Sequence, residues 1–153
     1  LIKKSLKIVD KLIVATTDNI EKDYLFSIDE RMDILKKSLF KDLRFNKNKI
    51  KIIAFDDLTV KICKKYNASI IIRGLRAVSD FEYEFQLAGM NKKLDKNIET
   101  IFLMSDIENE IISSKFIKEI GKLRGDLKKF ATKSVIKAIK AKFSWIKFIY
   151  YVL

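Results

Sequence analysis

Short apolar runs rich in β-branched residues recur along the chain and predict β-strands. Each run is too short for an ordinary helix and is bounded by polar residues. The nearly continuous apolar character of residues 69–72 is typical of strands buried on both faces of a parallel sheet. The expected strands are Leu12–Ala15, Ile50–Phe55, Ile70–Ile72 and Ile101–Met104.

Apolar positions spaced three and four residues apart fill the stretches between these strands and predict helices. The alternation of strand and helix predicts βαβ units, which build a mostly parallel sheet with helices on both faces. The expected fold class is therefore α/β. The expected helices are Ile28–Leu43, Leu58–Tyr66, Phe81–Leu94, Ser114–Leu123 and Lys133–Lys142.

Several helix starts carry residues that cap the first turn. Ser27 and Glu30 form a capping box, in which each side chain accepts a hydrogen bond from an otherwise unpaired backbone N–H. Short polar side chains before the other helices predict further caps. These are Asp56 or Asp57, Asp80, Ser113 and Thr132.

The two ends of the chain differ from the middle. Residues 1–9 have a helical pattern and run directly into the first strand, whereas a doubly wound sheet ordinarily opens with a strand and a phosphate-binding loop. We therefore expect that first β-strand to be absent. Residues 143–153 are unusually apolar and are interpreted, in order of preference, as an altered reading frame, an extra packing element or a membrane-surface contact. One domain over residues 1–142 is expected before this tail.

Residue counts exclude several kinds of chemistry. The chain has no histidine, so it contains no Ser/His/Asp triad, histidine base or histidine metal ligand. Cys63 is the only cysteine, which excludes an internal disulfide and argues against a zinc site. No run reaches the roughly 18 apolar residues of a membrane-spanning helix. These features predict a cytoplasmic protein without a membrane partner.

The chain is basic, with a net charge of +12 at pH 7. Much of the excess lies in residues 111–153, which contain eleven Lys and Arg residues against Glu119 and Asp126. Such a balance favours phosphates, nucleic acid or an acidic membrane surface as partners, and charge alone does not distinguish them. A genome rich in A and T also raises the lysine content without any partner.

The strongest candidate site follows the third expected strand. Arg73, Gly74 and Arg76 are expected just past its carboxyl end, where open α/β sheets bind ligands. Arginine donors match phosphate oxygens, and glycine lets a ligand approach the backbone. In the alternative interpretation, Arg73 and Arg76 only pair with surface carboxylates. Those carboxylates are Asp80, Glu82 and Glu84.

Residues 72–87 read Ile-Arg-Gly-Leu-Arg-Ala-Val-Ser-Asp-Phe-Glu-Tyr-Glu-Phe-Gln-Leu. This stretch resembles the signature of bacterial pantetheine-phosphate adenylyltransferases, and the resemblance covers about residues 1–140. It continues through residues 25–27 with 30–31, 91–94, 99–104, 112–114 and 117–119. The resemblance implies a Rossmann-like nucleotidylyltransferase fold with a parallel sheet and helices on both faces.

The resemblance also implies roles for individual residues. Lys22 and Arg76 are expected to be catalytic, through contacts with phosphates at the reacting centre. Lys22, Thr59 and Arg73 are expected to bind the phosphopantetheine substrate. The expected ATP-binding residues are Gly74, Leu75, Arg76, Glu84, Asn109, Glu110, Ile111, Ile112, Ser113, Ser114 and Lys115.

The match departs from the family at two places. The family usually has a third serine where this chain has Lys115, which loses one hydroxyl donor for phosphate. The family also opens with a Gly-Thr-Phe-Asp-Pro stretch and a Thr-x-Gly-His motif, and neither occurs in these 153 residues. Because the motif's histidine stabilises charge during transfer, the chain as given is expected to be weak or inactive.

The resemblance implies transfer of an adenylyl group from ATP to 4'-phosphopantetheine, with Mg²⁺ accompanying the ATP and no metal ligands in the protein. It also implies a homo-oligomer, a hexamer in the family, with no nucleic-acid partner. Two alternatives remain open. One is a non-catalytic remnant that binds ATP or coenzyme A. The other is a basic interaction protein whose carboxy-terminal helix lies on acidic lipid or nucleic acid.

Overall fold

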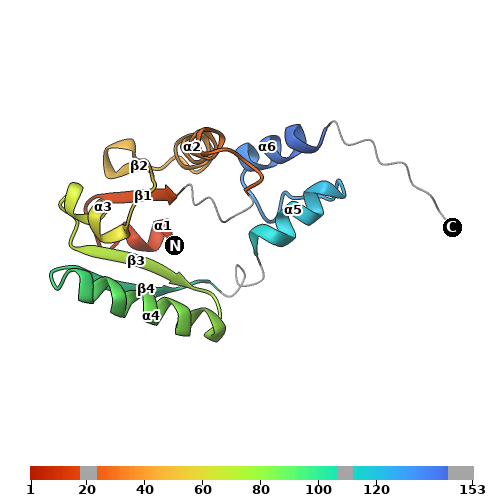
Figure 1. The fold of residues 1–153 in the computed structure, drawn as a ribbon. Helices are drawn as coiled ribbons and strands as arrows, with labels where there is room; N and C mark the ends of the chain where they lie inside the picture. Colours follow the sequence, from red (N-terminus) through yellow and green to blue (C-terminus); the bar gives the residue numbers. More distant parts are fainter. Residues whose placement is uncertain (18–23, 107–111, 145–153) are drawn as a thin grey trace.

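The computed structural model describes residues 1–17, 24–106 and 112–144, and it confirms an α/β chain (Figure 1). The strands are β1 (Leu12–Thr17), β2 (Ile50–Phe55), β3 (Ile70–Leu75) and β4 (Glu99–Met104). The α-helices are α1 (Ile2–Ser5), α2 (Ile28–Lys36), α3 (Thr59–Lys65), α4 (Val78–Leu94), α5 (Ser114–Lys122) and α6 (Lys133–Phe143). A π-helix, η1 (Lys37–Asp42), and a 3₁₀-helix, η2 (Lys47–Lys49), lie between α2 and β2.

The strands form two parallel pairs, β1 with β2 and β3 with β4. The register sets Leu12 opposite Ile50 and Ile70 opposite Glu99. The prediction of parallel strands is confirmed. The described strands form two small parallel sheets, and no described strand joins β1 to β3.

The carboxyl ends of the strands lie on one side of the molecule. The arrowheads of β1 and β3 point the same way in Figure 1, β2 runs parallel to β1, and β4 runs parallel to β3. The segments that follow the four strands lead into α2, α3, α4 and α5. This edge therefore collects the segments in which the sequence places its candidate site residues.

A small apolar core lies between α3 and the β3–β4 pair. It consists of Val60, Cys63, Ile71 and Ile98, with Ala68 packed against it. Burial raises the pKa of the Cys63 thiol, so this cysteine packs as a small apolar side chain and is a poor nucleophile. The core therefore fixes β3, the strand that carries the candidate site at its carboxyl end.

Three element boundaries differ from the sequence predictions by three residues or more. β3 continues to Leu75 because its backbone ladder with β4 persists past the polar residue, pairing Arg73 with Phe102. Helix α4 begins at Val78, three residues earlier than predicted. The predicted helix over residues 28–43 ends as an α-helix at Lys36 and widens into η1.

The predicted helix caps are confirmed at two places and wrong at two others. Ser27 and Glu30 form the capping box, and Ser113 Oγ accepts from the Phe116 N–H at 3.2 Å. The N-cap of α3 is Leu58 rather than Asp56 or Asp57. The N-cap of α4 is Ala77 rather than Asp80. The Asp57 and Asp80 carboxylates instead accept from the backbone N–H groups of Leu58 and Arg76.

Helix α6 is capped by a residue distant in sequence. Thr132 is its N-cap, as predicted, but makes no side-chain cap, because its hydroxyl lies 2.8 Å from Ser38 Oγ. Asp42 Oδ2 accepts from the Ser134 N–H at 2.7 Å instead. This bond holds the start of α6 against η1.

We expect Asp42→Asn to weaken the fold and to reduce its acid sensitivity. The hydrogen bond from the Ser134 N–H lowers the pKa of Asp42, so the carboxylate stabilises the fold above its unfolded-state pKa of about 4. That contribution is lost as the pH falls through the lowered value. Urea unfolding should give a lower midpoint for the variant at pH 7 and a smaller drop toward pH 3. If the urea midpoint fell equally between pH 7 and pH 3 in the parent and in the variant, the Asp42 carboxylate would not have this stabilising role.

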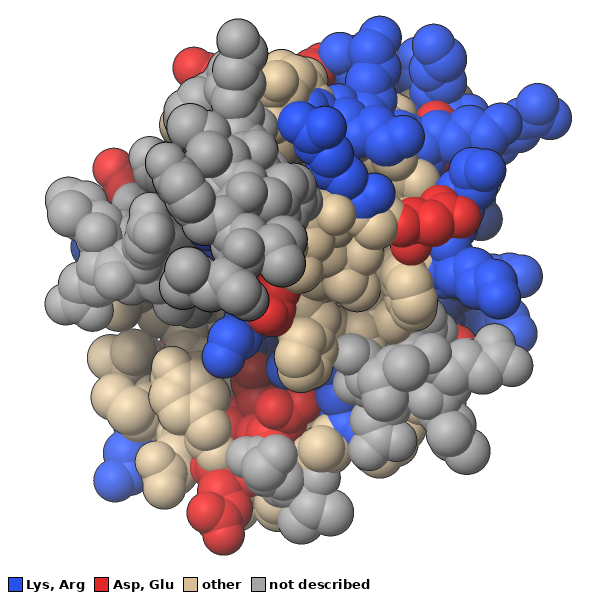
Figure 2. All heavy atoms as spheres, turned by 90° about the vertical axis from the view of Figure 1, so that its right-hand side faces the viewer, with Lys and Arg blue, Asp and Glu red and all other residues tan. Residues whose placement is uncertain are grey.

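Basic side chains are unevenly distributed over the surface. Figure 2 shows the face that lies on the right of Figure 1, and Lys and Arg gather in the upper right part of this face. This agrees with the excess of basic residues in the carboxy-terminal part of the sequence. Among the described helices, none is long and apolar enough to cross a membrane.

Candidate active site

Arg73 and Glu84 form a bidentate ion pair at the carboxyl end of β3. Arg73 Nε and Nη2 donate to Glu84 Oε2 and Oε1 at 2.7 and 2.6 Å. The hydrogen bond to Glu84 raises the pKa of Arg73, and the Glu84 side chain is only 13% exposed. This fork fixes the plane of the guanidinium and leaves its Nη1 group directed away from Glu84.

Arg76, which lies between β3 and α4, is held by an acidic residue of α4. Asp80 Oδ2 accepts from Arg76 Nε at 3.3 Å and from the Arg76 N–H at 3.2 Å. The backbone hydrogen bond is the main reason that the pKa of Asp80 is lowered. Both arginines therefore make the carboxylate pairs that the alternative interpretation anticipated. These pairs also orient the two guanidinium groups.

Gly74 and Leu75 offer mainly backbone to a ligand. The Leu75 side chain is buried, and its carbonyl accepts from the Ser105 N–H at 2.8 Å. A Cβ on Gly74 would lie 3.2 Å from Leu1 Cδ2, so the Leu1 side chain lies directly against this glycine. Arg73 and Gly74 are the last but two and last but one residues of β3, rather than residues beyond it as the sequence predicts.

The other predicted site residues follow the carboxyl ends of other strands. Thr59 is exposed at the first position of α3, just after β2. Lys22 belongs to the segment after β1 and, like Asn109, Glu110 and Ile111, lies outside the described residues.

The start of α5 presents the second half of the predicted ATP site. Ser113 is the N-cap, so the capping role foreseen as its alternative is observed. Ser114 and Lys115 are exposed in the first turn, and Ile112 is half-buried before it. A helix start of this kind presents unpaired backbone donors and a partial positive charge to an anion.

Arg31 is a structural contributor that the sequence did not single out. Its Nη1 donates to Thr17 O at 2.8 Å and to Thr16 Oγ1 at 3.2 Å, and its guanidinium lies 3.8 Å from the centre of the Tyr24 ring. Arg31 therefore contacts residues on both sides of the segment that contains Lys22. The one sequence feature that pointed to Arg31 is its position after Glu30, in a stretch that the chain shares with the family.

Lys4 is a second contributor that sequence reasoning missed. Its Nζ donates to Met104 O at 2.7 Å and pairs with Asp106 at the same distance. The hydrogen bond from Lys4 lowers the pKa of Asp106. Lys4 thus places a positive charge from α1 at the carboxyl end of β4. The helical pattern of residues 1–9 does not predict this long-range contact.

Comparison with known proteins gives the family. A family model described as cytidylyltransferase-like matches residues 1–120. The chain is 63% identical over 142 residues to the phosphopantetheine adenylyltransferase of Pelagibacter ubique, covering 93% of this chain and 87% of that protein. The chain belongs to the phosphopantetheine adenylyltransferases.

Other phosphopantetheine adenylyltransferases are similar over nearly the same span. The protein of Rhodospirillum centenum is 42% identical over 144 residues, covering 94% of this chain and 78% of that protein. That of Caulobacter vibrioides is 42% identical over 142 residues, covering 93% of this chain and 86% of that protein. The resemblance drawn from residues 72–87 is confirmed, and the chain is a nucleotidyltransferase of coenzyme A biosynthesis.

The described residues of this adenylyltransferase contain no cluster of side chains suited to bind a metal ion. No group of three or more His, Cys, Asp or Glu side chains lies close enough there to hold a metal ion. The nearest acidic groups to the arginines, Asp80 and Glu84, are already engaged by Arg76 and Arg73. The site that these residues form is therefore one of fixed cations and backbone donors, which suits phosphate groups.

Proposed function

We propose that this adenylyltransferase transfers the adenylyl group of ATP to 4'-phosphopantetheine, giving dephospho-coenzyme A and pyrophosphate. An oxygen of the 4'-phosphate attacks the α-phosphorus of ATP, and the bond from that phosphorus to the bridging oxygen of the pyrophosphate breaks. The observation that carries the proposal is the Arg73–Glu84 fork, a fixed cation at the carboxyl end of β3 within the family signature.

Transfer of this kind depends on in-line positioning and on cations placed where charge develops. We assign Arg73 to the phosphate of phosphopantetheine, because its Nη1 donors face away from Glu84. Thr59 lines the pantetheine chain. Lys22 and Arg76 neutralise the charge that builds up on the phosphates as pyrophosphate leaves.

ATP is assigned to the loop after β3 and the start of α5. Gly74 and Leu75 contribute backbone groups and Glu84 a carboxylate, and residues 109–115 are assigned to the phosphates. Ser113 and Ser114 suit the triphosphate because they begin a helix of nine residues. Lys115 replaces a hydroxyl donor with a point charge.

Mg²⁺ is proposed to enter as part of the ATP chelate. The described residues supply cations and hydroxyl groups rather than a cluster of carboxylates, so the triphosphate oxygens hold the ion. When bound, the ion offsets the charge of the leaving pyrophosphate.

The direct test is turnover by the protein expressed from its complete reading frame. Incubation with ATP, Mg²⁺ and 4'-phosphopantetheine is expected to give dephospho-coenzyme A and pyrophosphate in equal amounts. Binding of ATP without either product would instead support a non-catalytic remnant.

We further propose that the protein works in the cytoplasm as a homo-oligomer, a hexamer, through the exposed apolar side chains of α4. Met90 and Leu94 are 61% and 53% exposed, and Tyr83 is 64% exposed on the same side of the helix. Phe81 packs against Phe102 of β4 from one side of α4, so these residues form a second apolar stripe, and such a stripe is normally covered.

The variant Met90→Lys with Leu94→Lys is expected to lower the mass of the assembly, measured by light scattering at micromolar concentration. Two buried lysines at an interface are strongly unfavourable. The control variant Asn48→Lys adds a charge at an exposed position outside α4 and should leave the mass of the assembly unchanged. An unaltered mass in the α4 variant would exclude this face from the interface.

A further inference from the structure

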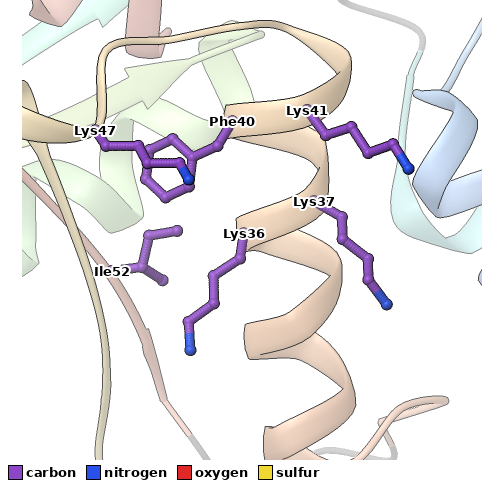
Figure 3. Close-up of a pocket in the computed structure, with 6 residues that line it drawn as sticks. All are labelled: Lys36, Lys37, Phe40, Lys41, Lys47 and Ile52. Carbon is purple, nitrogen blue, oxygen red and sulfur yellow. The ribbon is translucent and has the colours of Figure 1, made fainter.

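A pocket lies away from the candidate active site, beside the carboxyl end of α2. Its volume is about 450 Å³, and its lining residues are Lys36, Lys37, Phe40, Lys41, Lys47 and Ile52 (Figure 3). They come from the end of α2, from η1, from η2 and from the first half of β2. The candidate active site lies at the carboxyl ends of the strands, so the pocket is a separate feature.

Helical spacing divides the lining residues into two sets. Lys36 and Phe40 lie four residues apart on one side of the helix, and in Figure 3 Lys36 and Lys47 extend beside Phe40 and Ile52. Lys37 and Lys41 extend from the other side of the helix. The apolar wall of the pocket is thus flanked by two ammonium groups, with Lys47 Nζ 5.9 Å from the centre of the Phe40 ring.

The pocket has more positive charge than its surroundings neutralise. Lys37 pairs with Asp33 at 2.5 Å, but no ion pair is found for Lys36, Lys41 or Lys47 within the described residues. Residues 36–51 contain seven Lys and Arg residues and one acidic residue, Asp42, whose carboxylate accepts from the Ser134 N–H. Like charges around one cavity repel, and a bound anion removes that repulsion.

The backbone beside the pocket is also unusual. Residues 37–42 form a π-helix, in which the Leu43 N–H reaches back to Ser38 O at 2.9 Å. π-helical turns are rare and are frequent at functional sites. The inner side of this turn is fixed by buried Ser38 and Leu39, so its outer side, with Phe40, is held in place.

We propose that this lysine pocket is a second site that binds a nucleoside polyphosphate. The phosphates contact Lys36 and Lys47, and the base packs on Phe40 and Ile52. Lysine binds phosphate as a compact point charge, and an aromatic wall suits a planar base. The volume is in the range of small-ligand pockets. One hollow with one aromatic ring fits a single nucleotide better than an RNA strand, which needs a groove with successive stacking platforms.

The test uses methyl NMR of the full-length protein labelled at isoleucine δ1 methyl groups. The Ile52 methyl reports on the pocket, and the Ile112 methyl reports on the candidate active site. Titration with ATP is expected to shift the Ile52 signal saturably. The variant Lys36→Gln with Lys47→Gln should raise the apparent Kd at Ile52 by roughly tenfold or more, while the Ile112 response is unchanged.

A matched control removes the same charge elsewhere. Lys128 and Lys129 are exposed before α6 and do not line the pocket, so Lys128→Gln with Lys129→Gln should leave the Kd at Ile52 within about twofold of the parent. Phe40→Leu keeps an apolar side chain, so it should weaken ATP binding and leave inorganic tripolyphosphate binding unchanged. This pair of probes separates the base contact from the phosphate contact.

Several outcomes would overturn the proposal. They are no shift of the Ile52 methyl at millimolar ATP, equal weakening by the Lys128 and Lys129 control, and tighter binding of an oligouridylate than of ATP at Ile52. The Ile112 response is recorded in the same spectra. Failure of the second site is therefore distinguishable from failure of the proposed function.

Discussion

Replacing Arg73 with alanine is expected to lower kcat/KM for 4'-phosphopantetheine by about 10²–10³. The guanidinium supplies a fixed positive charge and paired donors, and the Glu84 fork holds it in one orientation. Lysine at this position keeps the charge but not the fork, so Arg73→Lys should recover only a small part of the loss. Steady-state kinetics with each substrate varied in turn measure the effect, and the KM for ATP should change less than that for phosphopantetheine.

Removing Arg73 also leaves the mostly buried Glu84 carboxylate without its partner, which can weaken the fold. The double variant Arg73→Ala with Glu84→Gln separates the two effects, because it removes the unpaired charge and should restore thermal stability without restoring turnover. Arg44→Gln, an exposed change in the η1–η2 connection, serves as the control for loss of one arginine. Activity within a few fold of the parent in Arg73→Ala would contradict the assigned role.

Gly121→Ala is expected to destabilise the protein by about 1–3 kcal/mol. Alanine ordinarily stabilises a helix relative to glycine, but a Cβ here would lie 2.3 Å from Ile139 Cγ2. Ile139 is only 2% exposed and is fixed in the contact between α5 and α6, so it has no room to move. Urea unfolding measures the change, which should appear as a lower midpoint with an unchanged slope.

The chain contains its own control for this substitution. A Cβ on Gly89, in α4, would meet nothing within 4 Å, so Gly89→Ala should be neutral or stabilise by up to about 1 kcal/mol. Ile139→Leu removes the methyl group at the point of contact and should recover part of the stability of Gly121→Ala. If the two glycine variants were equally stable, close packing of α5 on α6 would not be the reason for glycine at position 121.

Local patterns predicted the elements that depend on local forces. The capping box of Ser27 and Glu30 and the strand at Ile50–Phe55 follow from residues close in sequence. The parallel pairing follows from the alternation of strands and helices along the chain. The arginine cluster of the candidate site was also evident, because strand, glycine and arginines occupy consecutive positions. Its surface pairs with Asp80 and Glu84 were foreseen as an alternative to ligand binding, and the structure contains both pairs.

Long-range contacts were beyond the reach of the sequence patterns. Asp42 caps α6 across 92 residues, and Lys4 reaches Met104 across 100. Arg31 contacts Thr16 and Thr17 because α2 packs on β1, a fact of tertiary structure rather than of spacing. The π-helical turn over residues 37–42 has apolar spacing that an α-helix would share, so its extra width was not predicted.

Isotope labelling tests the proposed reaction most directly. The protein from the complete reading frame is given 4'-phosphopantetheine, Mg²⁺ and ATP labelled at either the α- or the γ-phosphorus. Attack at the α-phosphorus predicts that the α-label appears in dephospho-coenzyme A and the γ-label only in pyrophosphate. Transfer of the γ-label to the pantetheine compound, or absence of label in any product, would contradict adenylyl transfer by this protein.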